Sequence, residues 1–356
     1  MALIDVKSFT ADNGSLKMLS ELIFLATVAA GSLDKVATVL GGVQNGKKIN
    51  GVAGIGLIGS ASTGCETTYQ SLSLKGIEKT WNLGEWEIPL KLCYDEIKGK
   101  LMGLSLKQGI AIEDMRSDEF VTGVVEPLLR TAIEQMLWRL AWFGDKSATN
   151  VTSGGVITDG VDLKYFTLID GFWKQIFSAI TENPRHRVTI AANSQATLAG
   201  QFDGLYTKGV VTKIFDDLKR VADSRLWNKQ RVQVVATKSL VDALEWDVKE
   251  TNKGGDLAYT DLLNGMQLTK YRGMDIVSCP IFDTMIAENE NKGATLNLPH
   301  RAVLCSAADL LVGTGSTNSL DQVNMGYNEE NGHIWLKAKD TIGAVIVEDN
   351  LLAAAY

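Results

Sequence analysis

The most regular apolar pattern in the chain lies between residues 117 and 144. Apolar pairs recur at every fourth residue through this segment, and that spacing predicts a helix rather than a strand. Gly144 follows the last apolar residue and favours a left-handed helix end. Pro127 lies inside the segment, where proline removes a backbone hydrogen bond and bends a helix. We expect a helix over 117–143 with a bend at Pro127, although a shorter helix beginning near Pro127 fits the same pattern.

A second pattern, with the two-residue period of a strand, lies between residues 66 and 96. In its second half apolar residues alternate with other residues, at Trp86, Ile88, Leu90 and Leu92. Residues 82–84 supply a turn, and the more polar segment 67–79 precedes it. We therefore expect a long β-hairpin over 66–96, and Pro89 leaves it at least one open edge.

The apolar face of this hairpin needs a cover, because an isolated two-stranded ribbon is only marginally stable in water. Either the hairpin folds onto its own domain, or it lies across a neighbouring copy of the chain. In the second case Trp86→Ala leaves the subunit folded and weakens assembly. The candidate interface residues are then large apolar residues of the hairpin and of the long helix, namely Trp81, Trp86, Ile88, Leu90, Trp138 and Trp142.

The first 62 residues have little pattern apart from an apolar helix predicted over 16–29. The remainder is rich in glycine, which loses much entropy on ordering. A P-loop-like run begins at Gly41, but Lys48 occupies the place of the magnesium-binding Ser or Thr. A dinucleotide-like run begins at Gly54, yet no strand precedes it and no amphipathic helix follows. We interpret 1–62 as a flexible arm that surrounding protein holds in place.

The second half of the chain alternates helical and strand patterns, as α/β units do. We expect helices near 168–181, 211–223 and 237–249, and strands at 188–192, 232–236, 275–278 and 301–306. The Cys279-Pro280 pair ends the third of these strands, because proline cannot donate to a sheet. The tail is predicted to return to β-structure, with strands at 321–327, 333–339 and 341–348.

Composition excludes several classes of protein. At 356 residues the chain can build two or three domains with a substantial core. Its formal net charge of −7 argues against a reader of nucleic acid whose affinity comes from neutralising phosphates. No signal peptide is visible, and the apolar run 18–30 is too short to span a bilayer. We therefore expect a globular protein without a membrane partner.

The residues that usually carry chemistry are sparse and scattered. The four cysteines form no CxxC pair, and the chain holds only three histidines, so a metal site is not expected and the thiols are predicted to stay reduced. No GxSxG or HExxH motif is present, and no carboxylate pair has a spacing that indicates acid–base work. We expect no catalytic residues and no cofactor, and we predict that the protein is not an enzyme.

The order of these parts resembles that of tailed-bacteriophage major capsid proteins of the Hong Kong ninety-seven type. The helix end Phe143-Gly144-Asp145 is similar to the NGD that follows the spine helix in many members, with Phe143 in place of Asn. Residues 270–283 (KYRGMDIVSCPIFD) resemble the G-x-P-V strand and loop of the family's axial domain. The closing segment from Gly343 to Leu352 also matches.

The resemblance implies an α+β fold with four parts. These are an N-terminal arm (1–62), an extended β-hairpin loop (63–97), a peripheral domain (98–192 and 313–356) that carries the spine helix 117–143, and an axial α/β domain (193–312). Some members cross-link a loop lysine to an asparagine. Lys75 and Lys79 lie in the loop, but no matching glutamate or asparagine is found, so the cross-link is not carried over.

The resemblance also implies a function, which is self-assembly of hexamers and pentamers into an icosahedral shell around the double-stranded DNA of a tailed bacteriophage. The protein would be made in the host bacterial cytoplasm and reside in the virion capsid. Its partners would be its own copies, with portal, scaffolding or decoration proteins as further candidates, and the packaged DNA would be contacted non-specifically. Two alternatives remain open, an encapsulin-like shell around a protein cargo and a homo-oligomeric α/β enzyme.

Overall fold

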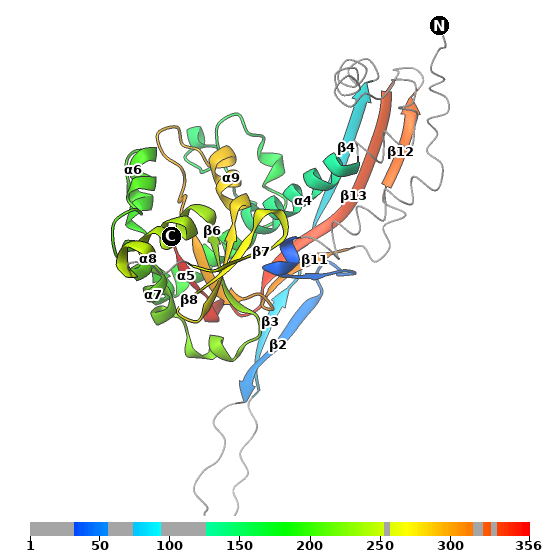
Figure 1. Cartoon of the computed structure of the whole chain (residues 1–356). Helices are drawn as coiled ribbons and strands as arrows, with labels where there is room; N and C mark the ends of the chain where they lie inside the picture. The colour runs from blue at the N-terminus through cyan, green and yellow to red at the C-terminus, as the bar shows by residue number, and fades with distance from the viewer. Residues whose placement is uncertain (1–31, 56–73, 94–125, 253–256, 316–322, 329–332) are drawn as a thin grey trace, which may run out of the picture.

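The computed structural model shows a rounded α/β body from which two β-structures extend in different directions (Figure 1). It describes residues 32–55, 74–93, 126–252, 257–315, 323–328 and 333–356. One extension is a sheet that leaves the upper side of the body, and the other is a two-stranded ribbon that leaves the lower side. The mixed helix-and-sheet architecture agrees with the predicted α+β class.

A seven-stranded sheet forms the centre of the body. Its strand order is β5-β14-β10-β6-β9-β8-β7, and the central pair β6 and β9 is parallel. The strands are β5 (Arg187–Val188), β6 (Val232–Thr237), β7 (Tyr259–Asp261), β8 (Gln267–Tyr271), β9 (Met274–Cys279), β10 (Ala302–Ser306) and β14 (Ala353–Ala355). Because β5 and β14 belong to segments assigned to the peripheral domain from the sequence, this sheet crosses the predicted limits of 193–312.

Helices cover both faces of this sheet because its central strands are apolar on both sides, as buried strands are. Val234 and Ala236 of β6 share a buried cluster with helices α7 (Val210–Val221) and α8 (Lys238–Asn252). Val235, between them, belongs instead to the cluster that contains residues of α4, α5 and α9. The remaining helices of the body are α4 (Glu126–Phe143), α5 (Phe172–Glu182), α6 (Leu198–Asp203) and α9 (Pro280–Asn289).

The predicted elements of this body are largely confirmed, with two exceptions. The strand expected over 188–192 is only β5, after which the chain turns into the short 3-10 helix η9 (Ala191–Ser194). The prediction that Cys279-Pro280 ends a strand is correct, but the helix α9 that begins at Pro280 was not expected. Proline is well suited to the first turn of a helix, where its missing N–H has no partner to lose.

The long helix ends where the sequence predicts, although for a different reason. The structure describes α4 from Glu126 to Phe143, and the predicted extension over 117–125, with any bend at Pro127, lies outside the described residues. Gly144 does not have the positive φ of a left-handed stop. A Cβ on Gly144 would lie 2.6 Å from the carbonyl oxygens of Leu140 and Ile169. Residue 144 therefore has to be glycine because the chain near Gly171 lies too close to leave room for a side chain.

Part of the predicted flexible arm belongs to the body. Residues 32–35 form the 3-10 helix η3 (Ser32–Lys35), and β1 (Thr38–Leu40) pairs with β11 (Leu310–Thr314). Val36 and Ala37 are fully buried in the subunit's own core. The prediction of a flexible arm is thus wrong for this stretch, whereas the helix expected over 16–29 lies outside the described residues.

A five-stranded sheet extends from the body (Figure 1). Its longest strand, β13 (His333–Ile346), carries β12 (Val323–Asn328) and β11 along one edge and β4 (Gly84–Cys93) along the other. The two tail strands predicted at 333–339 and 341–348 are therefore one continuous strand. Because β13 is 14 residues long, one end joins the body while the other lies far outside it.

The predicted hairpin over 66–96 has the correct strands but the wrong pairing. Strand β3 (Leu74–Thr80) pairs antiparallel with β2 (Lys48–Ile55), and these two form the second extension, the ribbon. Strand β4 pairs with β13 instead. The apolar face of β4 starts at the buried Trp86, so it belongs on a sheet that enters the core, whereas the more polar β3 can lie in a ribbon away from the core.

Candidate assembly surfaces

Two of the six predicted interface residues lie in the middle of the subunit's core. Trp138 and Trp142 stand one helical turn apart on α4, and their rings stack with centroids 6.3 Å apart. Both are fully buried, and both rings contact Phe282 of α9. The indole N–H of Trp138 donates to Ser32 Oγ at 2.9 Å. The prediction that these two residues form an interface is wrong for the folded subunit, because neither side chain reaches its surface.

Trp81 and Trp86 are also buried in their own subunit. Trp81, between the ribbon and β4, packs against glycines of two strands, and a Cβ on Gly313 would lie 2.7 Å from its ring. Trp86 is 5% exposed and belongs to the same buried cluster as Ala338 and Ile342 of β13. These two residues therefore do not form an exposed apolar face, which corrects the prediction for them.

The last two candidates lie on β4 beyond the body. Ile88 is half-buried, and Leu90 is 40% exposed. Trp86, Ile88 and Leu90 share one face of β4, so burial decreases along this face as the strand leaves the body. Trp335 of β13 is exposed too, and it pairs with Lys91, which places it on the opposite face. Both faces of the extending sheet thus expose a large apolar side chain.

The ribbon is held at its root by backbone and side-chain contacts. The amide of Trp81 donates to Lys47 O at 3.0 Å, and the amide of Gly46 donates to Trp81 O at 2.9 Å. The amide of Leu83 donates to Asn45 Oδ1 at 3.0 Å. Beyond this root the two strands pair with each other, and within the part of the chain that the structure describes no third strand joins them.

One buried polar group resembles catalytic chemistry and has to be tested against the enzyme alternative. Ser239 Oγ lies 2.9 Å from His300 Nδ1, and His300 Nε2 lies 3.0 Å from Gln201 O. Burial lowers the pKa of His300 to about 4, so the ring is neutral and a weak base at neutral pH. Asp283 accepts from the backbone amides of Lys238 and Ser239 and caps α8, so no carboxylate orients the histidine.

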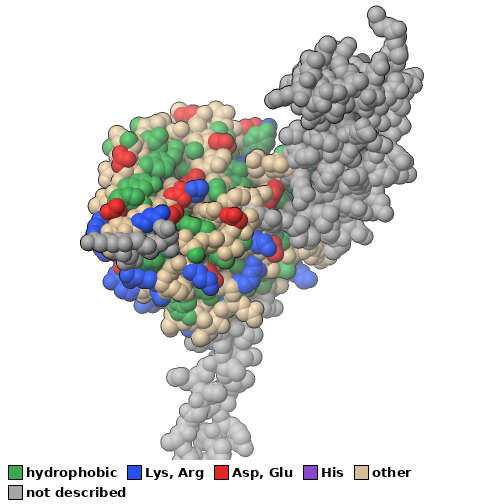
Figure 2. Space-filling model, in the orientation of Figure 1, with side chains coloured by type: hydrophobic (Ala, Val, Ile, Leu, Met, Phe, Trp, Pro, Cys, Tyr) green, Lys and Arg blue, Asp and Glu red, His purple; other side chains and the backbone are tan. Residues whose placement is uncertain are grey.

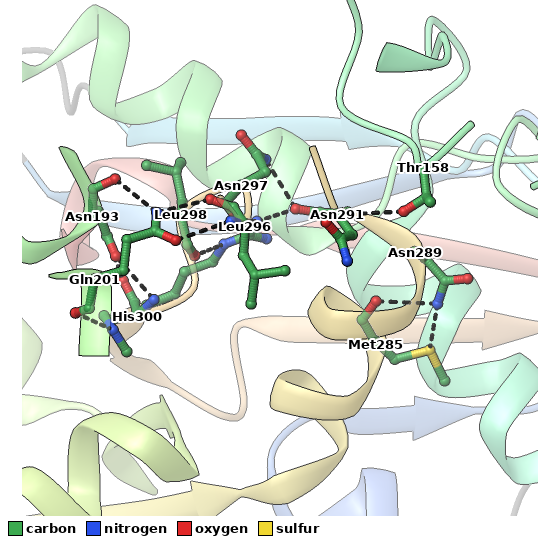
Figure 3. Close-up of polar contacts among 12 residues, drawn as sticks. Thr158, Asn193, Gln201, Met285, Asn289, Asn291, Leu296, Asn297, Leu298 and His300 are labelled. Atoms are coloured by element: carbon green, nitrogen blue, oxygen red, sulfur yellow. Dashed lines mark hydrogen bonds and ion pairs between the residues drawn. The ribbon is translucent and has the colours of Figure 1, made fainter. Parts of the chain in front are cut away.

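The surroundings of His300 show that this group is structural. Figure 3 shows Asn193, Gln201 and Leu296 closing a network of amide and backbone hydrogen bonds around it. The Asn193 side chain both donates to His300 O and accepts from its amide, at 2.8 and 3.0 Å. His300 has no exposed surface. The His300 ring is therefore closed off within the fold, whereas Ser239 on α8 is half-buried.

A cavity of about 570 Å³ lies between α4, α5 and the loop before β10. Trp142, Phe143, Trp173 and Phe177 are among its lining residues. The guanidinium of Arg301, also in the lining, is bound by the Glu290 carboxylate and by the carbonyls of Leu298 and Asn297. The charge of Arg301 is thus neutralised within the fold.

The described residues also offer no metal site. No group of three or more His, Cys, Asp or Glu side chains among them could hold a metal ion. Cys279 and Cys305 are free, buried thiols, and burial raises the pKa of Cys305 to about 12, which keeps it protonated. Among the helices described, none is long and apolar enough to cross a membrane.

Charged side chains on the visible face of the body are mixed in sign. Figure 2 shows acidic and basic side chains interspersed with apolar ones over this face. Over the described residues as a whole, many basic side chains are paired locally, for example Arg225 with Asp223, Lys238 with Asp242 and Arg272 with Asp216. This face therefore lacks the dense positive field by which a protein concentrates nucleic acid.

Comparison with known proteins identifies the fold. No protein-family model matches the chain, and no curated protein matches its sequence. Among solved structures, it matches a chain of the satellite phage P4 procapsid, a structure that includes the size determination (Sid) protein. The identity is 10%, the match covers 95% of this chain and 97% of that chain, and the TM-score is 0.51.

Other matching structures come from phages and related particles. The capsid of the native GTA particle matches with 10% identity over 91% of this chain and 89% of that chain, with a TM-score of 0.45. Mycobacterium phage Adephagia matches with 10% identity over 100% and 97% of the two chains, with a TM-score of 0.43. The P4 match, which spans nearly the whole of both chains, establishes that this chain has the fold of phage capsid proteins, as the resemblance predicted.

Proposed function

We propose that this protein is the major capsid protein of a tailed bacteriophage, whose copies assemble as hexamers and pentamers into an icosahedral shell around double-stranded DNA. The capsid fold supports a structural, non-enzymatic role. The two extensions of the subunit support assembly, because each carries surface that the subunit does not cover.

The observation that carries the proposal is the ribbon formed by β2 and β3. Its seven or eight residues per strand correspond to a length of about 25 Å at roughly 3.3 Å per residue. A two-stranded ribbon is marginally stable alone. Among the described residues no further strand pairs with its outer edges, so their N–H and C=O groups are open to a partner strand. A neighbouring copy that packs along the ribbon would supply both the missing contacts and the missing edge partners.

The extending sheet supports the same proposal. Leu90 on one face and Trp335 on the other are exposed on the part of the sheet that extends from the body. Contacts on both faces of one sheet suit a subunit that has neighbours on two sides. Interfaces of that kind bury thousands of Å² in obligate assemblies.

The finer features of the proposal follow the capsid role. The ribbon is the proposed extended loop, the seven-stranded unit the proposed axial domain, and the extending sheet with α4 the proposed peripheral domain. Mixed surface charge and the net charge of −7 would favour weak, non-specific contact with packaged DNA. The proposed partners are further copies of the chain, with portal, scaffolding or decoration proteins as additional candidates, in a virion made in the host cytoplasm.

Electron microscopy of the purified full-length protein tests the proposal directly. We expect closed shells in negative stain and a mass of many subunits by light scattering. A compact dimer or tetramer would refute the proposal and favour the α/β enzyme. Shells from the native source that contain protein cargo and show no nucleic-acid absorbance would instead identify an encapsulin-like compartment.

A further inference from the structure

Three consecutive residues after β13 bind three different parts of the subunit. Glu348 forms an ion pair with Lys229, which follows the 3-10 helix η10 (Ser224–Asn228). Asp349 Oδ2 lies 2.5 Å from the Nζ of Lys79, on strand β3 of the ribbon. Asn350 Oδ1 accepts from Asn183 at the end of α5, at 3.2 Å. This junction, residues 348–350, thus connects the ribbon to the body.

The junction is itself firmly placed in the body. It leaves β13 of the extending sheet and continues through the 3-10 helix η13 (Asp349–Leu351) into β14, inside the seven-stranded sheet. Leu351 and Leu352 are buried on either side of that transition. Asp349 is therefore a charge on a segment anchored in the core, whereas Lys79 belongs to a ribbon that is rooted at Trp81.

Attachments at two separate points fix the direction of the ribbon, whereas a single attachment would let the ribbon rotate about it. At the root, Trp81 is buried against Gly313 and Gly343, so the root can serve as a pivot without moving. The Lys79–Asp349 pair contacts β3 two residues away from Trp81 and fixes the angle about that pivot. Over a ribbon of about 25 Å, a rotation of roughly 10° would move the far end by about 4 Å.

We propose that Asp349 is a positioning residue, which through Lys79 sets the angle at which the ribbon leaves the body. Given the capsid role proposed above, this angle sets where the ribbon meets the neighbouring copy, and so the curvature of the shell. The side chains of the pair are 35% and 31% exposed, so a single pair contributes only weakly. The preference for one ribbon angle acts in every subunit, however. If each copy favours that angle twofold, six independent copies together favour it by about 60-fold.

The first test measures the ribbon angle in the dissociated subunit. Spin labels on Gly76→Cys in the ribbon and Lys213→Cys in α7, in a background with Cys65 and Cys93 replaced by serine, report the distance by pulsed electron resonance. We expect Asp349→Asn to broaden the distance distribution, because a roughly twofold preference for the native angle is lost. An unchanged distribution overturns the proposal, and this result does not depend on whether the protein forms shells.

The second test measures the diameter of assembled particles. Lys79→Met and Asp349→Asn are expected to give shells of altered or mixed diameter, and the charge exchange Lys79→Asp with Asp349→Lys is expected to restore both the diameter and the label distance. The matched control is Lys48→Met, which removes the exposed Lys48–Glu78 pair inside the ribbon and should leave both unchanged.

The outcomes separate this proposal from the capsid proposal. If the unaltered protein forms no shells, the capsid role fails while the label distances still decide the role of Asp349. If the distance distribution broadens but shell diameter is unchanged, the link between ribbon angle and curvature is overturned. If Lys48→Met matches the effects of Asp349→Asn, the effect is one of general charge and the positioning role is wrong. Thermal melting of each subunit confirms that the variants are folded.

Discussion

Replacing Trp86 by alanine distinguishes a core residue from an interface residue on the same strand. Trp86 is 5% exposed and belongs to the central buried cluster. Truncating a buried tryptophan to alanine costs about 3–5 kcal/mol, because apolar contact is lost and a cavity remains. The Nε1 atom of Trp86 has no hydrogen-bond partner among the described residues, and an unpaired buried donor costs about 1–3 kcal/mol. Its removal offsets part of the loss, so we expect destabilisation near 3 kcal/mol.

Two further variants make this expectation specific. Trp86→Phe keeps most of the ring and removes the unpaired N–H, so its cost should stay below about 1.5 kcal/mol. Leu90→Ala alters the same face of β4 where the side chain is 40% exposed, and the subunit should lose only about 1 kcal/mol or less. Assembly should respond in the opposite order, since Leu90 is available to a neighbouring copy and Trp86 is not.

Urea unfolding of dissociated subunits, followed by the fluorescence of the remaining tryptophans, measures these differences in free energy. Particle yield at a fixed subunit concentration measures assembly for the same three variants. The reasoning is refuted if Trp86→Ala subunits unfold at the same urea concentration as the unaltered protein yet fail to assemble. That outcome would place Trp86 at an interface, as its position in the alternating pattern first predicted.

Three other changes test individual packing and charge relations in the body. Gly313→Ala should destabilise the subunit by about 1–3 kcal/mol in urea unfolding, because its Cβ would overlap the Trp81 ring. Glu290→Gln should cost about 3–5 kcal/mol in the same assay, because it leaves the buried charge of Arg301 unpaired. His300 has a folded-state pKa of about 4, against 6.5 in the unfolded chain. As the pH falls from 6.5 to about 4, only the unfolded chain takes up a proton at this residue. The free energy of unfolding should therefore fall by up to about 3 kcal/mol. His300→Gln should remove that part of the pH dependence of the urea midpoint, and an unchanged slope would contradict the assignment.

Local pattern predicted the body well because its elements bury their own periodic faces. The apolar run at 232–236 and the amphipathic repeat at 211–223 each require a core on a defined side, and α7 and β6 meet in one buried cluster. The end of α4 was predicted for a reason that does not hold. Gly144 allows close contact with the chain near Gly171, and a contact between distant residues leaves no local mark on the sequence.

Strand pairing is where sequence patterns failed, because a period of two specifies a face and not a partner. The pattern of β4 fits any apolar neighbour, and only the fold shows that this neighbour is β13. Strand β2 has a glycine-rich sequence with no alternation, so nothing in it indicates a strand until β3 lies beside it. The same limit explains why four tryptophans were assigned to an interface. The sequence shows that a large apolar side chain is buried, but not whether its own subunit or another copy buries it.

In the proposed shell, folding and assembly are separate tasks of neighbouring residues. Along β4 the change occurs within four residues, from Trp86 in the core to Leu90 in the exposed part of the sheet. The body closes its core with all four predicted interface tryptophans. Among the described residues, the ribbon and the outer part of the extending sheet are therefore the surfaces we propose for contact with neighbouring copies. Substitutions on these two extensions should then alter particle yield or size at nearly constant subunit stability, whereas substitutions in the body should change stability first.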